Sequence, residues 1–369
     1  MAENGPSYTI AVSRSPGERR VALLKGGILV EVVHSRDAAV QPGAVYAGRV
    51  GPRVPGMDAV FVAIDSGLAG VLKTKTPPPE GTAVAVSVVA PPRPGKGPEL
   101  KSVSHALANV TAPALLASAP DPVVTWWERY ASQVQSVLCD APREAARLKE
   151  LLGAGPIMVQ GDGDLFAELG IDEAIEAALL PQVDLPGGGN VIIETTAALT
   201  TIDINAGASN PAAANHAAMP VIARELRKRN LAGHFVVDVI PGKGNGALPR
   251  LLTKALADDP CPARVVGTTP LGMIEFTRRR LGLSLAEQLL EGGAPNTASI
   301  AYASLRQGVR QALRERAAHV TITAAPDVIA LLQGGLRPAL TEAAEILKAD
   351  VKLAPEPSYP RAKFVCKTI

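Results

Sequence analysis

A change of pattern near residue 186 constrains the fold more than any other feature of this 369-residue chain. The turn Pro186-Gly187-Gly188-Gly189 separates a helical region from a region of strands. Four apolar segments of strand length follow the turn: Val191–Glu194, Leu199–Ile204, Phe235–Ile240 and Arg264–Val266. A helical segment with several basic residues lies between the second and the third. Strand–helix–strand alternation predicts an α/β or α+β domain, which we place at residues 185–290.

Short strands interrupted by Gly and Pro are predicted for residues 39–103. They are Val45–Val50, Ala59–Ile64, Ala69–Leu72 and Ala83–Val89. This spacing is typical of a small all-β barrel. Residues 20–33 are expected to form two more strands around Lys25-Gly26-Gly27, and we expect the N-terminal strands of residues 1–38 to pack with a middle subdomain.

Two further regions complete the predicted organisation. Residues 104–183 are expected to be mainly helical. After a loop at Glu291–Asn296, residues 297–369 are expected to form a small C-terminal α/β domain. Its predicted elements are a helix at Tyr302–Arg316, a strand at Val320–Ile322, helices around Val328–Leu332 and Ala339–Leu347, and one or two final strands. The sequence therefore predicts a multidomain protein of the α+β or α/β class.

Composition narrows the class of protein. Apolar residues make up 47% of the chain and charged residues 20%, so a sizeable core is expected and wholesale disorder is excluded. The three cysteines lie far apart, which argues against a disulfide framework or a zinc cluster and favours a reducing cytoplasm. The chain has no signal-peptide pattern and no run of about 18 apolar residues, so we expect neither secretion nor a membrane span.

Two acids in apolar strands are the candidate catalytic residues. Side chains alternate along a strand, so Asp203 and Asn205 point away from Ile202 and Ile204, and Asp238 lies in the following strand. Acids on adjacent strands are able to share Mg²⁺, which needs only one or two carboxylates plus water. The pattern predicts a metal-assisted phosphodiester site. The spacing leaves open an alternative, in which each acid forms a structural ion pair with an arginine and Asn205 serves a turn.

Basic residues cluster on both sides of Asp238, although the formal net charge of +2 gives no overall signal for nucleic acid. Guanidinium groups bind phosphates in a bidentate manner, so these residues are candidate contacts to a nucleic-acid backbone. The candidates are Arg224, Arg227, Lys228, Arg278 and Arg280. The alternative is a solvated basic helix face held by i,i+4 ion pairs.

Six stretches of the sequence, taken in order, resemble the catalytic core of the ribonuclease E/G family. They are Leu185–Glu194, Ala198–Asn205, Ile222–Arg227, Leu231–Gly233, Val237–Asp238 and Leu271–Leu281. The resemblance also touches the N-terminal barrel and the segment before the core, at Val60–Val62, Gly70–Leu72, Gly95–Gly97, Leu165-Phe166 and Ile171–Glu173. It is specific in the core and weaker elsewhere.

The resemblance implies a fold and an activity. The barrel at 39–103 would be an OB-fold, 104–184 a shortened RNase H-like and sensor region, and 185–290 a DNase I-like catalytic domain with a mixed sheet. Asp203 and Asp238 would coordinate Mg²⁺, with Mn²⁺ as the alternative ion, and Asn205 would assist. The reaction would be endonucleolytic cleavage of single-stranded RNA, which leaves a 5′-phosphate and a 3′-hydroxyl.

In the barrel, the resemblance implies that Phe61 stacks on RNA bases and that Lys96 contacts RNA through its charge. The family's neighbouring stacking positions correspond to Ile64 and Val71 here. Since each stacked base contributes roughly 1–3 kcal/mol, we expect weaker single-strand binding.

The sequence departs from the family at three other places. Glu291–Asn296 replaces the Cys-Pro-x-Cys pair that holds a zinc between subunits, so we expect no zinc, and any homo-oligomer would lack a zinc link. The Arg-Thr pocket that senses a 5′-monophosphate has no match. Pro220 falls within the helix between the two acids, so that helix either begins near Pro220 or bends there.

Three functions are therefore compared. The leading hypothesis is a Mg²⁺-dependent endoribonuclease that processes or degrades RNA in the cytoplasm. The second is a catalytically weak or inactive RNA-binding paralogue of the same family. The third is an unrelated metal-dependent phosphohydrolase that acts on small phosphate esters.

Overall fold

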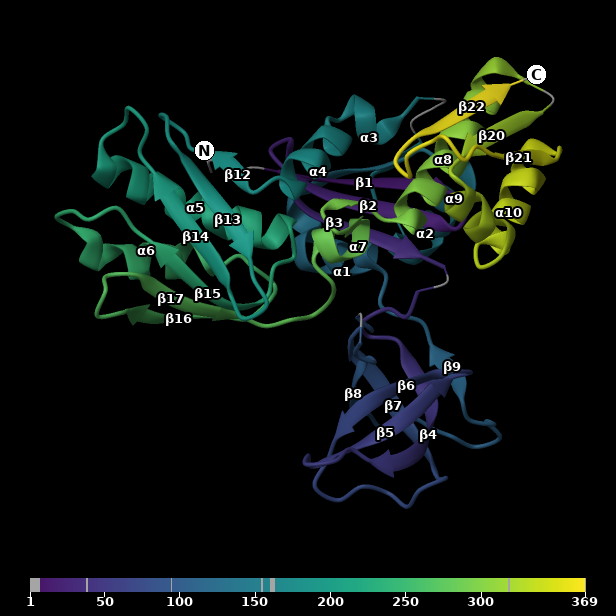
Figure 1. Cartoon of the computed structure of the whole chain (residues 1–369), viewed down its shortest axis with the longest axis horizontal. Helices are drawn as coiled ribbons and strands as arrows, with labels where there is room; N and C mark the ends of the chain where they lie inside the picture. The colour runs from purple at the N-terminus through teal and green to yellow at the C-terminus, as the bar shows by residue number, and fades with distance from the viewer. Residues whose placement is uncertain are drawn as a thin grey trace. The chain divides into compact units, whose positions relative to one another are not determined.

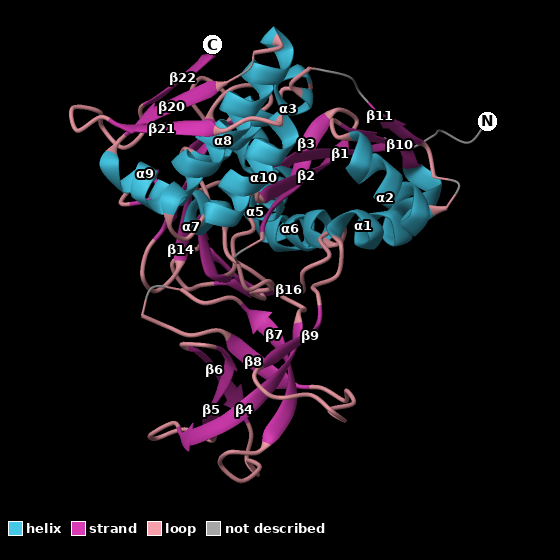
Figure 2. Cartoon of the chain, turned by 90° about the vertical axis from the view of Figure 1, so that its right-hand side faces the viewer, coloured by secondary structure: helices cyan, strands magenta, loops and turns pink. Residues whose placement is uncertain are grey.

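The computed structural model describes residues 7–37, 39–93, 95–153, 155–159, 163–317 and 319–368. The chain divides into two compact units (Figures 1 and 2). Unit 1 combines Met1–Ala39, Pro122–Leu179 and Leu285–Ile369, and unit 2 combines Val40–Asp121 with Leu180–Ser284. No helix in the described part of the chain is long and apolar enough to cross a lipid bilayer.

Unit 1 is built on a five-stranded sheet with the order β11-β10-β1-β2-β3. The strands are β1 (Tyr8–Ser15), β2 (Glu18–Lys25), β3 (Ile28–Arg36), β10 (Val134–Cys139) and β11 (Ile157–Val159). β1, β2 and β3 are antiparallel, whereas β10 runs parallel to β1 and to β11. The N-terminal strands therefore share one sheet with strands from the middle of the chain.

Helices cover both faces of this sheet. One face packs against α1 (Pro122–Tyr130), which is followed by the short helix η1 (Ala131–Gln133), and against α2 (Pro142–Leu152). The other face packs against α3 (Leu165–Glu168), α4 (Ile171–Leu179) and α7 (Leu285–Leu289). The prediction of a mainly helical region at 104–183 is wrong in part, because it also contains the strands β9 (Ala114–Ala117), β10 and β11 and the start of β12 (Gln182–Asp184). β10 is covered on both faces and shows no clean alternation of apolar and polar residues, which is why it was missed.

The C-terminal part of unit 1 has the elements that the sequence predicts. They are α8 (Thr297–Glu315), β20 (Val320–Ala324), α9 (Pro326–Gln333), α10 (Arg337–Leu347), β21 (Val351–Pro355) and β22 (Phe364–Thr368). The predicted loop at Glu291–Asn296 instead contains a short hairpin of β18 (Leu290–Glu291) and β19 (Ala294–Pro295). Gly292 and Gly293 adopt φ angles of 60° and 81°, which is the backbone that a tight two-residue hairpin turn requires.

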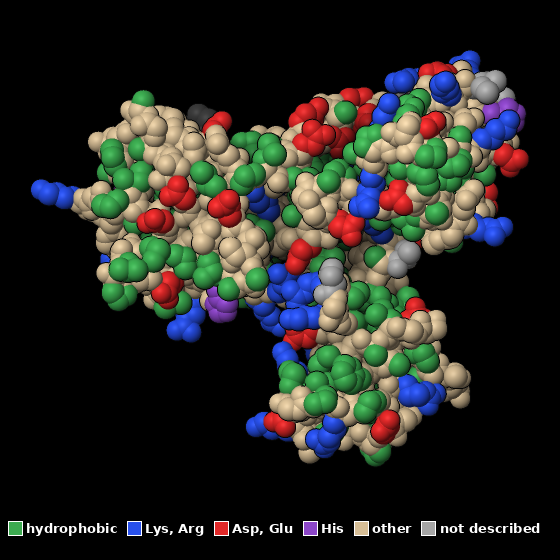
Figure 3. Space-filling model, in the orientation of Figure 1, with side chains coloured by type: hydrophobic (Ala, Val, Ile, Leu, Met, Phe, Trp, Pro, Cys, Tyr) green, Lys and Arg blue, Asp and Glu red, His purple; other side chains and the backbone are tan. Residues whose placement is uncertain are grey.

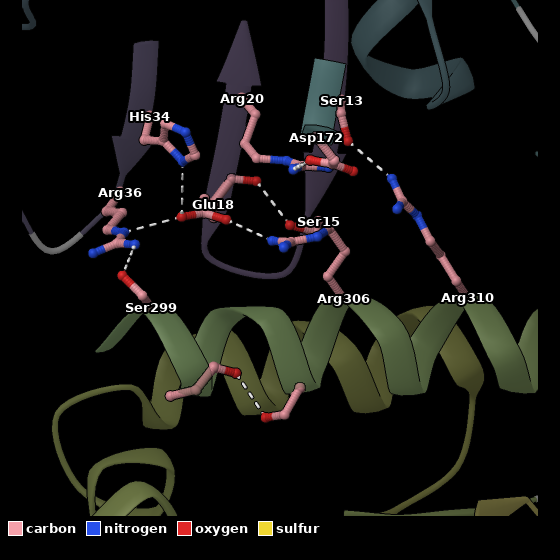
Figure 4. A network of polar contacts seen from close by, with 12 residues as sticks. Ser13, Ser15, Glu18, Arg20, His34, Arg36, Asp172, Ser299, Arg306 and Arg310 are labelled. Atoms are coloured by element: carbon pink, nitrogen blue, oxygen red, sulfur yellow. Dashed lines mark hydrogen bonds and ion pairs between the residues drawn. The ribbon is translucent and has the colours of Figure 1, made fainter. Parts of the chain in front are cut away.

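A buried carboxylate joins α8 to the five-stranded sheet (Figure 4). Glu18, only 1% exposed, accepts hydrogen bonds from Arg36 Nε at 3.0 Å and Arg306 Nη1 at 2.8 Å. Burial opposes ionisation of Glu18, but His34, Arg306 and Arg36 outweigh burial and hold the pKa of the carboxyl well below its usual value. Burial lowers the pKa of His34 in spite of its contact with Glu18. Arg310 extends the network, because its guanidinium donates to Ser13 and to Asp140.

The predicted small β-barrel is confirmed in unit 2. Its strands are β4 (Val45–Arg53), β5 (Ala59–Asp65), β6 (Leu68–Lys73), β7 (Ala83–Ala90) and β8 (Glu99–Ser102). They follow one another around the barrel as β5-β6-β8-β7-β4, and a pairing of β4 with β5 closes the ring. A sixth strand, β9 (Ala114–Ala117), adds to β4. Aliphatic side chains such as Val62, Ile64 and Val86 fill the interior.

The rest of unit 2 is a mixed six-stranded sheet with the order β12-β13-β14-β15-β17-β16. The strands are β12 (Gln182–Asp184), β13 (Asn190–Thr195), β14 (Thr200–Asn205), β15 (Gly233–Asp238), β16 (Ala263–Thr268) and β17 (Ile274–Arg278). Only β14 and β15 are parallel neighbours. Two helices, α5 (Pro211–Lys228) and α6 (Leu248–Leu256), join the strands and bury one face of the sheet. The short helix η2 (Asn245–Ala247) precedes α6.

The helix α5 begins nine residues before Pro220, so this proline lies inside the helix and does not start it. Asn210 caps the helix by accepting from the amides of Ala212 and Ala213, and Pro211 occupies the first turn, where a missing N–H costs nothing. The exposed Pro220 removes one backbone hydrogen bond from the helix interior.

Replacing Pro220 by Ala is expected to stabilise α5 by about 1–3 kcal/mol, because the amide at position 220 regains its helical acceptor. Hydrogen–deuterium exchange of the α5 amides, followed by mass spectrometry, measures the change. Pro211→Ala is the matched control, since a proline at the helix start has no hydrogen bond to restore. Equal protection in the two variants would contradict this account of Pro220.

Candidate active site

Strand alternation brings the two predicted acids to one face of the mixed sheet. In β14, Ile202 and Ile204 are buried against the helices, while Asp203 is exposed on the opposite face. In β15, Val237 is buried and Asp238 is exposed on that same open face. Asp203 and Asp238 are register partners in adjacent parallel strands, whose backbones lie about 4.8 Å apart. Residues from two separate segments therefore place two carboxylates side by side.

Asn205 belongs to the same group of side chains. Its Nδ2 donates to Asp203 Oδ2 at 3.0 Å and to Asn190 Oδ1 at 3.3 Å. Asn190 is the register partner of Asn205 on β13, so it reaches the amide from the neighbouring strand. Because both contacts use the NH₂ group, the Oδ1 atom of Asn205 is left to accept from water or to bind a cation.

The loop that precedes β13 packs against the end of β14. Ser209 Oγ donates to the carbonyl of Gly187 at 2.5 Å. Gly189 has φ of +83°, and a Cβ atom on it would lie 2.2 Å from the carbonyl oxygen of Asn205. Only glycine fits this position, so the turn found in the sequence has a structural role beside the site.

These donors suit a hard divalent cation with few protein ligands. Within the described residues, no three His, Cys, Asp or Glu side chains come together as an all-protein metal site requires. Mg²⁺ retains waters and often uses one or two carboxylates together with substrate phosphates. The pair of Asp203 and Asp238, with the free Oδ1 of Asn205, matches that donor set and does not match a zinc site.

The comparisons with known proteins identify the family of the chain. The sequence model of the Ribonuclease E/G family matches residues 98–281, which include both acids and Asn205. The chain belongs to the ribonuclease E/G family. It is 32% identical over 209 residues to Ribonuclease E of Nostoc sp., and this match covers 51% of the chain and 30% of that relative. It is 30% identical over 242 residues to Ribonuclease G of Salmonella typhimurium, and this match covers 60% of the chain and 48% of the relative.

A third relative matches the chain at a similar sequence identity. Ribonuclease G of Haemophilus influenzae is 33% identical over 173 residues, which cover 42% of the chain and 35% of that protein. The chain thus spans less than half the length of each of these three curated ribonucleases.

The basic residues predicted to bind RNA mostly have structural partners. Arg278 is 4% exposed and donates to Asp259 from Nε at 2.7 Å and to the Leu231 carbonyl from Nη1 at 2.6 Å. Arg227 is 8% exposed and donates to the Asp258 carbonyl. Burial leaves Arg227 and Arg278 with little surface for a phosphate, so we correct their assignment to a structural one.

The other predicted basic residues differ in exposure. Lys228 forms a 2.7 Å ion pair with the buried Glu225, and its side chain is 12% exposed, so its assignment also becomes structural. Arg224 is half-buried and lies 3.7 Å from Glu225, while the half-buried Arg280 donates to the Gly282 carbonyl. Arg224 and Arg280 keep some surface, and their role in RNA binding stays a prediction.

Sequence reasoning missed a basic hollow on the open face of the mixed sheet. His234, Thr277 and Arg264 occupy one row across β15, β17 and β16, and Arg279 lines the same hollow. His234 lies four positions before Asp238, so it shares a face with Asp238 at a separation of about 13 Å along the strand. The alternation of side chains between the two faces of β15 and β16 is the sequence signal that could have identified these residues. Figure 3 shows basic side chains at the lower edge of the lobe that carries α5 and β12–β17.

The barrel residues lie on two neighbouring strands and one loop. Phe61 on β5 is half-buried and pairs with Val71 on β6. Lys96 is exposed in the turn between β7 and β8, where its backbone exchanges hydrogen bonds with Arg93. Ile64 is 1% exposed inside the barrel, so its assignment to a stacking position is corrected to the core.

Proposed function

We propose that this chain is a Mg²⁺-dependent endoribonuclease that cleaves single-stranded RNA and leaves a 5′-phosphate and a 3′-hydroxyl. The observation that carries the proposal is the register pairing of Asp203 with Asp238 on the open face of the mixed sheet. Membership of the ribonuclease E/G family supports the choice of RNA as the substrate.

Asp203 and Asp238 would hold the ion, and Mn²⁺ would substitute for Mg²⁺. A bound Mg²⁺ polarises a phosphoryl oxygen and lowers the pKa of a coordinated water. The Asn205 amide, held through its NH₂ group by Asp203 and Asn190, presents Oδ1 as an acceptor that orients the attacking water. The open face of the sheet admits an extended strand, which fits a single-stranded substrate better than a small phosphate ester.

The RNA backbone would follow the basic hollow. Arg264, Arg279 and His234 line it, and His234 lies about 13 Å from Asp238 along β15. Lys243, exposed in the loop after β15, is a further candidate phosphate contact. These exposed residues replace the buried Arg227 and Arg278 in the proposed RNA path.

We also propose an OB-fold for the barrel, a DNase I-like fold for the mixed sheet and a shortened RNase H-like fold for the sheet of unit 1. In an OB-fold the second and third strands and the loop between the fourth and fifth strands bind oligonucleotides. Phe61 and Val71 lie on the second and third strands of this barrel, and Lys96 lies in the loop between its fourth and fifth strands. Their placement supports a stacking role for Phe61 and a charge role for Lys96.

The test is a cleavage assay with a labelled, A/U-rich single-stranded RNA. We expect cleavage that requires Mg²⁺, stops on chelation and is restored by Mn²⁺, with products that carry a 5′-phosphate and a 3′-hydroxyl. Cleavage that survives chelation, or products with a cyclic phosphate, would contradict the proposed chemistry. The second candidate is a weak or inactive RNA-binding paralogue, which is motivated by the missing Cys-Pro-x-Cys pair and the missing Arg-Thr pocket, and it predicts RNA binding with no cleavage.

The basic hollow makes a separate prediction about binding. Arg264→Gln and Arg279→Gln are each expected to weaken RNA binding and to reduce the slope of log K against log salt by about 0.7, since each removes one phosphate contact to a single strand. Fluorescence anisotropy with labelled RNA at several salt concentrations measures both quantities.

Arg278→Gln is the matched control, because Arg278 lies beside Arg279 but is buried. This change is expected to lower the free energy of unfolding by about 3–5 kcal/mol, since it leaves the buried Asp259 carboxylate without its cationic partner. An unchanged salt slope in the Arg264 and Arg279 variants would rule out the proposed path.

A further inference from the structure

A buried amide behind the sheet bears on the acidic site. Asn215 lies in the second turn of α5 and is 1% exposed, between Ala214 and Ala218 in the core of the mixed sheet. An amide in apolar surroundings costs free energy unless it is hydrogen-bonded, so its partners indicate why it is there.

The Asn215 side chain forms its hydrogen bonds with the segment after Asp238. Nδ2 donates to the Ile240 carbonyl at 2.8 Å, and Oδ1 accepts from the Ile240 amide at 3.1 Å. Nδ2 also contacts Asn245 Oδ1 at 3.2 Å, and Asn245 Nδ2 donates to the same Ile240 carbonyl at 2.9 Å. Asn215 therefore occupies both backbone groups of Ile240, as a neighbouring strand would.

This contact begins where the sheet ladder ends. The last register pair of β15 with β17 is Val237 with Ile274, and the last with β14 is Asp238 with Asp203. Beyond Asp238 the described structure gives β15 no further strand partner. Asn215 pairs with the backbone of Ile240, two residues past the acid, so hydrogen bonds hold the chain both before and after Asp238.

The side chain of Asp238 depends on this backbone support. Within the described residues, no hydrogen bond or ion pair holds its exposed carboxylate, whereas Asn205 holds that of Asp203. A shift of about 1 Å at a catalytic group can cost roughly 100-fold in rate. The position of the backbone at residues 238–240 thus determines whether the two carboxylates can bind one cation.

We infer that Asn215 is a positioning residue, which acts from the buried face of the sheet to hold Asp238 in register with Asp203 for metal binding. The inference rests on the proposed function. It assigns to α5 a role beyond packing, because the helix carries the amide that orders the loop after β15.

The test measures Mn²⁺ binding in the absence of RNA, by electron paramagnetic resonance of the free ion, together with RNA cleavage by the full chain. Asn215→Ala is expected to weaken Mn²⁺ binding by about 10- to 100-fold, to lower kcat by a similar factor and to leave KM within about threefold. Asn215→Asp is expected to behave alike, since a carboxylate accepts from the Ile240 amide but repels its carbonyl.

Asn296→Ala is the control for lost stability alone. Asn296 also hydrogen-bonds backbone groups, as the cap of α8, and it lies in unit 1. This variant is expected to keep wild-type Mn²⁺ binding. Should Asn215→Ala fail to fold, Asn245→Ala tests the inference in its place, because it removes one donor to Ile240. It is expected to weaken Mn²⁺ binding by about threefold to tenfold.

The two ideas fail in different ways. Wild-type Mn²⁺ affinity and kcat in folded Asn215→Ala, or in Asn245→Ala where that variant decides, would overturn the inference and leave the proposed function intact. A wild-type chain that binds no Mn²⁺ and cleaves no RNA would overturn both.

Discussion

Asp203→Asn is expected to lower kcat/KM for Mg²⁺-dependent RNA cleavage by about 10³-fold, which corresponds to about 4 kcal/mol of transition-state stabilisation. The change keeps the shape of the side chain. It weakens or reverses the hydrogen bond with the Asn205 amide, because a neutral amide replaces the charged acceptor. It removes one of two adjacent negative charges, so the affinity for a divalent cation falls. Asp238→Asn is expected to have the same effect, since the two acids share one row of the sheet.

Rates measured over a range of Mg²⁺ concentrations with a labelled single-stranded RNA test this prediction. Glu194→Gln is the matched control, because Glu194 is an exposed carboxylate on the adjacent strand β13. It is expected to retain cleavage within about threefold, since exposed charges of this kind contribute little. A loss of the same size in all three variants would indicate a general electrostatic effect and not a metal site.

Glu18→Gln is expected to lower the free energy of unfolding of unit 1 by about 3–5 kcal/mol, because it leaves the half-buried guanidinium groups of Arg36 and Arg306 without their carboxylate. The two tryptophans of the chain, Trp126 and Trp127, both lie on α1 in unit 1. Their fluorescence during urea unfolding therefore reports on this unit and not on unit 2.

The control is Glu99→Gln, since Glu99 pairs with Lys73 on the barrel surface, where the side chains are 45% and 63% exposed. An exposed pair of this kind contributes less than about 1 kcal/mol. Because Glu99 lies in unit 2, its effect is read from the circular dichroism of the whole chain. A small and equal effect of both substitutions would show that the Glu18 network adds no stability.

The Glu18 network also makes stability depend on pH. The pKa of Glu18 is lowered in the folded state, so its contribution is complete above the unfolded value of 4.5 and is lost as the pH falls below it. The difference in stability between the wild type and Glu18→Gln is therefore expected to be constant near neutral pH and to shrink in acid.

Local patterns predicted the elements whose two faces have different surroundings. The barrel strand expected at Val45–Val50 is observed as Val45–Arg53, and the helix expected at Tyr302–Arg316 is observed as Thr297–Glu315. β10 escaped prediction because it is covered by helices on both sides, so burial on distant segments removed the alternation on which the prediction depends.

Local sequence patterns also failed to distinguish buried from exposed basic residues at the site. The sequence identifies Arg278 and Arg279 equally as cations. Both line the hollow, but Arg278 is buried and paired with Asp259, whereas Arg279 is exposed. Residue type is local information, whereas exposure depends on which face of β17 packs against the helices. The role of Asn215 was hidden for a similar reason, because its partner Ile240 lies on another element.

The sequence by itself determined the candidate acids, the alternation that points Asp203 and Asn205 away from the core, and the glycine turn before β13. Only the tertiary structure decided that Asp203 and Asp238 share one row, that α5 and α6 leave their face open, and which arginines reach that face. The physical reason is that alternation follows from the backbone of one strand, whereas register follows from the packing of two strands against a common core.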